Sequence, residues 1–210
     1  MVQAVGITEA ITSLNEAHDK LNLSQSTDNH FFREWFEGLP ELTEQEKESL
    51  NGLKNRYLYH AADGAITEGT INIIMLSPLL ELVQLCDPPF KIKGEASVKV
   101  ELEDEDVVLQ GRIDALVVQN QFWVVVIEAK RYGFTASFAI PQALAYMMAN
   151  PHSERPTFGM VTNGQHYIFI KLTAQEKQYA LSDEFTISKR SNNELYEVLR
   201  VMKQIAGAIA

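Results

Sequence analysis

The residues from Gly111 to Lys130 decide the fold of this chain: Gly-Arg-Ile-Asp-Ala-Leu-Val-Val-Gln-Asn-Gln-Phe-Trp-Val-Val-Val-Ile-Glu-Ala-Lys. A polar Gln-Asn-Gln stretch separates two apolar runs, which predicts a β-hairpin. The second run is almost wholly apolar, as expected of a strand that is covered on both faces. Beyond Arg112 at its start, the hairpin carries three charged side chains, those of Asp114, Glu128 and Lys130. Because burying an unpaired charge is costly, they need partners or a function.

Helical patterns dominate the chain before this hairpin. Apolar residues three and four positions apart predict a helix over residues 5–21, and the capping-box pattern Thr43-Glu-Gln-Glu46 predicts the start of another. The aromatic stretch 31–36 between them is expected to pack as a plug onto the core rather than to stack on nucleic-acid bases. A further helix is expected from Thr67, with a kink at Pro78.

After two consecutive prolines the period changes from helix to strand. Strands are expected over residues 90–92, 98–102, 107–118, 122–130, 157–161 and 167–172, with short edge strands over 179–181 and 185–187. Helices are expected from Ile140 to Asn150 and over residues 194–209. The order predicts one mixed α/β domain over residues 1–210. It divides into a helical arm (1–62), a core (63–172) and C-terminal strands with a closing helix (173–210).

Composition limits the function. The net charge of −10 argues against a generic basic nucleic-acid binder, although an enzyme can meet DNA through a local patch or a partner subunit. The single cysteine, Cys86, is expected to be a buried thiol, and the cytoplasm is the expected compartment. No signal-peptide pattern occurs, and no apolar run approaches the ~20 residues that span a bilayer, so no membrane partner is expected.

The three charges of the hairpin can form one site. Side chains alternate across a strand, so Glu128 and Lys130 share a face, and the hairpin can bring Asp114 close to Glu128. Two converging carboxylates repel each other unless a cation lies between them, and oxygen ligands suit Mg²⁺ or Mn²⁺. Lys130 could orient an attacking water or neutralise charge at a phosphate. A structural ion pair at a strand end is the alternative that spacing leaves open.

The same residues resemble the PD-(D/E)XK nuclease superfamily. Thirteen residues separate Asp114 from Glu128-Ala-Lys130, and Gln142-Ala-Leu-Ala-Tyr146 follows as a Gln-x-x-x-Tyr motif. Together with the later Thr-Asn-Gly, this order is similar to the N-terminal nuclease domain of type I restriction motor subunits over roughly residues 67–172. The resemblance implies a restriction-endonuclease-like fold, in which helices flank a mixed β-sheet.

The resemblance also implies roles. Asp114 and Glu128 would be ligands of Mg²⁺ or Mn²⁺, and Lys130 would be the catalytic lysine. Gln142 and Tyr146 would support the site or contact the DNA backbone. Families of this fold often add an acidic residue from the helix before the sheet. Glu68 is the candidate for that metal ligand, and Glu81 is the runner-up.

Three departures from the family pattern leave the function open, and one of them is the net charge of −10, which opposes autonomous binding to DNA. Ile113 stands where the family name has proline, and no Gly-x-x-x-x-Gly-Lys-Ser/Thr P-loop occurs in these 210 residues, so they lack an ATP-driven motor. The predicted function is a Mg²⁺-dependent, restriction-related endonuclease acting on DNA. Its expected partners are DNA and restriction-system subunits, with a homodimer left open. The alternative is a non-catalytic binding or assembly module of nuclease fold.

Overall fold

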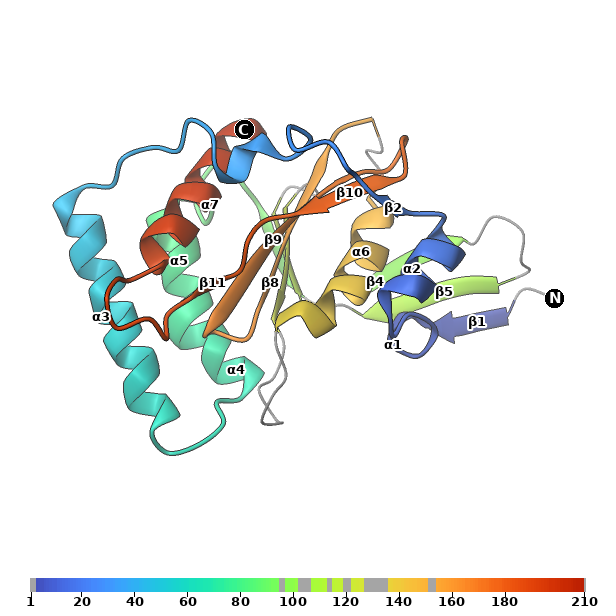
Figure 1. Cartoon of the computed structure of the whole chain (residues 1–210). Helices are drawn as coiled ribbons and strands as arrows, with labels where there is room; N and C mark the ends of the chain where they lie inside the picture. The colour runs from blue at the N-terminus through green and yellow to red at the C-terminus, as the bar shows by residue number, and fades with distance from the viewer. Residues whose placement is uncertain are drawn as a thin grey trace.

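A mixed β-sheet separates two layers of helices (Figure 1). The structure is a computed structural model that describes residues 3–94, 97–101, 107–112, 115–118, 122–126, 136–150 and 154–209. In spatial order the sheet contains β2 (Ser24–Gln25), β10 (Gln178–Leu181), β9 (His166–Thr173), β8 (Thr157–Thr162), β7 (Phe122–Val126), β6 (Ala115–Val118) and β3 (Ile92–Gly94). Strand β11 (Phe185–Thr186) also pairs with β9. The predicted mixed α/β class is confirmed.

Each face of the sheet has its own apolar core. One core contains α3 (Glu44–Ala61), α4 (Glu68–Ile71), α5 (Ser77–Leu82) and α7 (Leu195–Ile209). The other contains α1 (Ile7–Ala10), α2 (Leu14–Leu21) and α6 (Ile140–Met148). Strand alternation supplies both cores, because Tyr167 and Phe169 of β9 face the first while Ile168 and Ile170 face the second. Burial on both faces explains the continuous apolar runs of the central strands.

The predicted hairpin is confirmed by its register. Strands β6 and β7 are antiparallel, and Val118 pairs with Phe122 while Ala115 pairs with Val125. The expectation of one strand over residues 107–118 is wrong, because its two described parts belong to different sheets. Strand β5 (Val107–Arg112) lies in a second, three-stranded sheet between β1 (Gln3–Gly6) and β4 (Ser97–Glu101), whereas β6 lies in the large sheet.

The predicted single helix over residues 5–21 is also wrong. The chain runs as β1, then α1, and restarts as α2 after Ser13. The Ser13 hydroxyl accepts a hydrogen bond from the Glu16 amide (3.2 Å), and the Glu16 carboxylate accepts one from the Ser13 amide (3.1 Å). This capping box begins a new helix in the middle of the expected one.

The helices before the sheet begin largely where the sequence predicts. The capping box at Thr43 starts α3, and Thr67 caps α4. Instead of a kink at Pro78, a π-helical turn (Asn72–Leu76) joins α4 to α5, and Pro78 lies in the first turn of α5. Cys86 is exposed, which corrects the expectation of a buried thiol. Among the described residues, no helix has the length and apolar character needed to cross a membrane.

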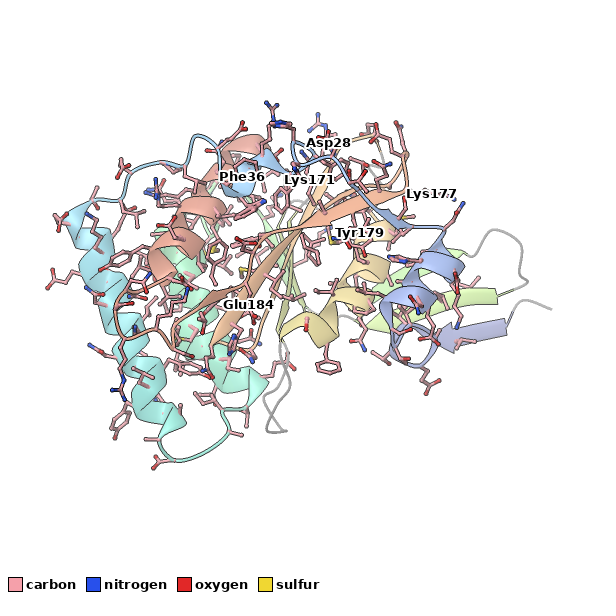
Figure 2. All side chains as sticks on the ribbon, in the orientation of Figure 1. Asp28, Phe36, Lys171, Lys177, Tyr179 and Glu184 are labelled. Atoms are coloured by element: carbon pink, nitrogen blue, oxygen red, sulfur yellow. The ribbon has the colours of Figure 1, made fainter. Side chains whose placement is uncertain are left out.

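The aromatic stretch forms part of the first core, as predicted. Phe32 is buried against Phe158, with ring centroids 6.1 Å apart, whereas Phe36 remains 43% exposed. Within it, a short 3-10 helix (Arg33–Trp35) is held to β9 by an ion pair of 2.6 Å between Lys171 and Glu34. Lys171 lies on β9 close to this segment, and Phe36 lies above α7 (Figure 2).

Candidate active site

The ends of three neighbouring strands lie together on one side of the large sheet, and we call this row of strand ends the candidate edge. Strand β6 begins there at Ala115, which pairs with Val125 near the end of β7. Strand β8 runs parallel to β7, and its last residue, Thr162, pairs with Val126, the last residue of β7. In α/β sheets, ligands commonly bind beyond the carboxyl ends of such strands. This edge is therefore the candidate site.

The three predicted hairpin charges lie outside the described residues. Asp114 directly precedes Ala115 in the sequence, and Glu128 and Lys130 follow Val126 by two and four positions. The pairing of β6 with β7 brings together the described strand ends from which these segments continue.

A tight turn borders this edge between β8 and β9. The Asn163 side-chain oxygen accepts hydrogen bonds from the amides of Gln165 (3.0 Å) and His166 (2.8 Å). The Thr162 hydroxyl accepts one from the Gly164 amide (2.9 Å), and Tyr167 donates its hydroxyl to the Gly164 carbonyl (3.0 Å). Burial raises the pKa of Tyr167, so this phenol stays a neutral donor. These bonds fix the conformation of the turn.

Gly164 allows two helices to pack on this turn. Its φ of +81° favours glycine, and a Cβ atom there would lie 2.8 Å from Tyr57 of α3 and 3.2 Å from Ile71 of α4. Helix α4 therefore lies at the candidate edge. Glu68 is its first residue and is half-buried, whereas Glu81 is exposed on α5, farther along the chain.

The π-helical turn after α4 contains a feature that the sequence did not reveal. Asn72 lies one turn after Glu68, and its buried side-chain oxygen has no hydrogen-bond partner among the described residues. An unsatisfied buried acceptor is costly, and π-turns are frequent at functional sites. Sequence patterns that predict helices carry no signal for a π-turn, because five consecutive apolar or amide residues such as Asn72–Leu76 fit an ordinary helix equally well.

Helix α6 carries the Gln-x-x-x-Tyr pair. It connects the parallel strands β7 and β8, so its first turn lies towards the edge where β7 ends (Figure 1). Tyr146 is buried and Gln142 is half-buried. Gly159 of β8 permits close packing here, since a Cβ atom would lie only 2.7 Å from the sulfur of Met147. The structure thus places both side chains on a helix seated directly against the sheet.

The described residues alone do not complete a metal site. Within this part of the chain, no three His, Cys, Asp or Glu side chains come together as a possible metal cluster. Of the four proposed acidic ligand positions, Glu68 and Glu81 are described, and Asp114 and Glu128 are not. Carboxylate oxygens of this kind are the ligands that Mg²⁺ and Mn²⁺ prefer.

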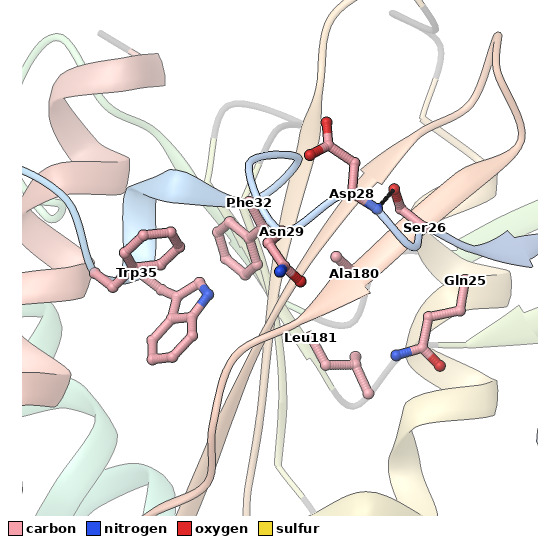
Figure 3. Close-up of a pocket in the computed structure, with 9 residues that line it drawn as sticks. Gln25, Ser26, Asp28, Asn29, Phe32, Trp35, Ala180 and Leu181 are labelled. Carbon is pink, nitrogen blue, oxygen red and sulfur yellow. Dashed lines mark hydrogen bonds between the residues drawn. The ribbon is translucent and has the colours of Figure 1, made fainter.

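A separate pocket of about 490 Å³ lies between the aromatic segment and the sheet edge formed by β2 and β10 (Figure 3). Phe32, Trp35 and Leu181 give it apolar walls, and its one drawn hydrogen bond joins the Asp28 amide to the Ser26 hydroxyl (3.3 Å). Among the described residues that line this pocket, Asp28 is the one ionisable side chain, so the pocket pairs a single carboxylate with no imidazole, thiol or ammonium group.

Comparison with known proteins gives one family. A family model described as type I restriction enzyme R protein N terminus (HSDR_N) matches residues 7–178. The matched range contains the candidate edge, α4 and α6. No curated protein matches the chain.

Proposed function

Because the chain belongs to the family of type I restriction enzyme R protein N-terminal domains, we propose that it is a metal-dependent endonuclease that hydrolyses phosphodiester bonds in DNA. The observation that carries this proposal is the pairing of Ala115 with Val125 and of Val126 with Thr162. It assembles at one edge the strand ends next to Asp114 and Glu128, with α4 packed beside them. Such an arrangement suits a two-carboxylate metal site.

Four side chains would bind the metal and act on the phosphate in the proposed site. Asp114, Glu128 and Glu68 would hold Mg²⁺ or Mn²⁺, and a bound ion would supply a water of lowered pKa and neutralise charge on the phosphate. Lys130 would orient that water and stabilise the negative charge that develops at the phosphorus. Glu81 is less suitable than Glu68, because it is exposed on a later helix.

Gln142 and Tyr146 would position the site from α6. They lie four residues apart and therefore share one face of this helix. Because Tyr146 is buried, it is suited to fixing neighbouring groups rather than to contacting DNA. Gln142 is partly exposed in the first turn, where its amide can donate to a carboxylate ligand or to a phosphate oxygen.

A non-catalytic assembly module is the second candidate. The net charge of −10 favours it, because such a charge opposes unaided binding to DNA. In this alternative the domain would bind other subunits of a restriction system and retain only the fold of a nuclease. Proteins of the matched family are parts of restriction enzymes, so DNA and such subunits are the proposed partners.

A plasmid-nicking assay with Mg²⁺ or Mn²⁺ distinguishes the two candidates. We expect the wild-type chain to nick the plasmid, and Asp114→Ala and Lys130→Ala to lose at least a hundredfold in rate, since each would remove a group acting on the reacting phosphate. Asp19→Ala, which removes an exposed carboxylate on α2, is the matched control and should retain activity. Equal background cleavage by all four proteins would contradict the nuclease proposal.

A further inference from the structure

A polar groove of about 520 Å³ lies between α3 and the loop that connects β11 to α7. In Figure 1 this loop runs beside α3 before it enters α7. Asn51, Lys54 and Asn55 line the groove from α3, and Arg190, Asn192 and Tyr196 line it from the loop and α7. The described residues that line it include no aspartate or glutamate, although the chain contains 28 acidic residues. The groove is therefore locally positive on an acidic protein.

The two cations of the groove form no ion pair with any carboxylate of the described residues. Lys54 donates to the backbone carbonyls of Lys189 (2.6 Å) and Asn192 (3.0 Å), which hold the loop but leave the ammonium charge uncompensated. Arg190 is exposed and makes no ion pair with any described residue. By contrast, the neighbouring Lys189 forms an ion pair with Glu194 (2.6 Å). Two unpaired positive charges therefore remain available to an anion.

Hydrogen bonds also orient an amide donor towards this groove. The Asn51 side-chain oxygen accepts from the amide of Asn193 (3.1 Å) and from the hydroxyl of Tyr196 (3.0 Å). Because two donors occupy the oxygen, the amide nitrogen of Asn51 is the atom left for a ligand. That nitrogen can only donate, so it favours an anionic oxygen, as Lys54 and Arg190 do.

The groove lies next to the candidate active site. The Ile187 amide donates to the Gln165 carbonyl (3.0 Å), which joins the loop to the turn between β8 and β9. On the other wall, Tyr57 of α3 packs against Gly164 of the same turn. The loop and the helix that carry the groove residues thus both contact, through Ile187 and Tyr57, the turn that borders the candidate edge.

We infer that this groove binds the phosphodiester backbone of DNA and holds the duplex beside the candidate edge. The inference rests on the proposed function for the identity of the polyanion. Arginine, lysine and amide nitrogens are the groups that contact phosphates in protein–DNA complexes, and such contacts position the duplex without reading its sequence. A locally positive binding groove of this kind allows the chain to bind DNA despite its net charge of −10.

Fluorescence anisotropy with short DNA duplexes of two unrelated sequences tests the inference, without divalent metal and over a range of salt concentrations. Arg190→Gln should weaken binding several-fold for both sequences and reduce the slope of log K against log salt by about 1, the loss of about one phosphate contact. Arg155→Gln is the matched control, because Arg155 is also exposed, has no ion pair among the described residues and lies at the opposite end of β8. It should leave both quantities unchanged.

Parallel nicking assays separate this inference from the proposed function. If the wild type nicks DNA and Arg190→Gln binds DNA as tightly as the wild type, the groove is not a DNA-binding site. The nuclease proposal then still holds. If Arg190→Gln weakens DNA binding and Arg155→Gln does not, but the wild type does not nick DNA, the inference that the groove binds DNA is supported. The nuclease proposal then fails. The inference would be overturned if Arg190→Gln and Arg155→Gln weakened DNA binding equally, or if the wild type did not bind DNA.

Discussion

At the scale of single residues, Gly164 determines how closely the helices approach the candidate edge. Its positive φ and its contacts with Tyr57 and Ile71 leave no room for a side chain. The turn that it completes is fixed by side-chain bonds from Asn163 and Thr162. The dipeptide Asn-Gly predicts a two-residue hairpin turn from sequence alone. The register pairs Thr162 with Tyr167, so the turn is longer than that prediction. Its packing against α3 and α4 cannot be predicted, because those helices are distant in the chain.

Gly164→Ala is expected to lower the free energy of unfolding by about 2 kcal/mol, because it adds left-handed backbone strain and a steric overlap with Tyr57. Urea denaturation at neutral pH measures the loss. The control is Gly52→Ala in the middle of α3, where a Cβ atom meets no neighbour. That change should raise stability by about 0.5 to 1 kcal/mol, since alanine is the better helix former. An equal response at both positions would contradict this role of Gly164.

The choice between the two helix glutamates is also a prediction about single residues. Glu68→Gln should reduce metal-dependent nicking by at least tenfold, because it replaces a charged oxygen ligand by a neutral amide at the edge of the site. Glu81→Gln makes the same chemical change on the exposed surface of α5 and should leave the rate unchanged. Nicking rates measured at several Mg²⁺ concentrations check this prediction, because the loss of a ligand raises the Mg²⁺ concentration that is needed for half-maximal rate. The reverse ranking would assign the role to Glu81.

At the scale of elements, local patterns predict correctly where local forces dominate. Helix α6 has its proline in the first turn, β8 and β9 pair as antiparallel strands around Asn163-Gly164, and α7 follows its apolar spacing. Strand β1 and the parallel pairing of β2 with β10 were missed, because both depend on partners far away in the sequence. The candidate site shows the same limit. Its motif spacing is visible in sequence, whereas the π-turn at Asn72 and the groove at Arg190 arise only from packing.

The capping box of α3 supplies a prediction at this scale. Thr43→Ala should cost about 1 kcal/mol of unfolding free energy, because the Thr43 hydroxyl accepts from the Glu46 amide (3.2 Å) and donates to the Glu46 carboxylate (3.0 Å). Ser49→Ala, an exposed change within the same helix, should cost less than half as much. Urea unfolding of both variants provides the comparison. Equal losses would show that the box does not stabilise α3.

At the scale of the whole molecule, hydrogen-bonded ion pairs make stability depend on pH. Burial alone raises the pKa of Glu46, but hydrogen bonds from Lys203 and Thr43 outweigh it and lower the pKa overall. Glu194 behaves in the same way, with burial opposed by bonds from Lys189 and the Thr186 amide. A carboxyl whose folded pKa lies below its unfolded value of about 4.3 stabilises the fold above that pH. This contribution disappears as the pH falls through the lowered folded pKa.

We therefore expect the urea midpoint to fall as the pH decreases below about 4.5, where the unfolded chain binds protons more readily than the folded one. Glu46→Gln should be less stable than wild type at pH 7 and should lose less on acidification, because one of the responsible groups no longer titrates. Glu48→Gln, which changes an exposed glutamate without an ion pair among the described residues, should retain the full wild-type dependence. If the urea midpoints of all three proteins changed equally with pH, the attribution of this pH dependence to Glu46 would be contradicted.

Metal binding should also be visible in the stability of the whole chain. If Asp114 and Glu128 face each other without a cation, their repulsion destabilises the fold, so Asp114→Asn should match or exceed the wild-type Tm in EDTA. Mg²⁺ at about ten times its Kd should stabilise the wild type by about 1.4 kcal/mol, a rise of roughly 3 to 6 °C for a chain of this size. The variant should not respond to Mg²⁺, whereas Asp19→Asn should respond like wild type. Thermal unfolding at constant ionic strength measures these shifts, and an equal Mg²⁺ response in Asp114→Asn would place the bound ion elsewhere.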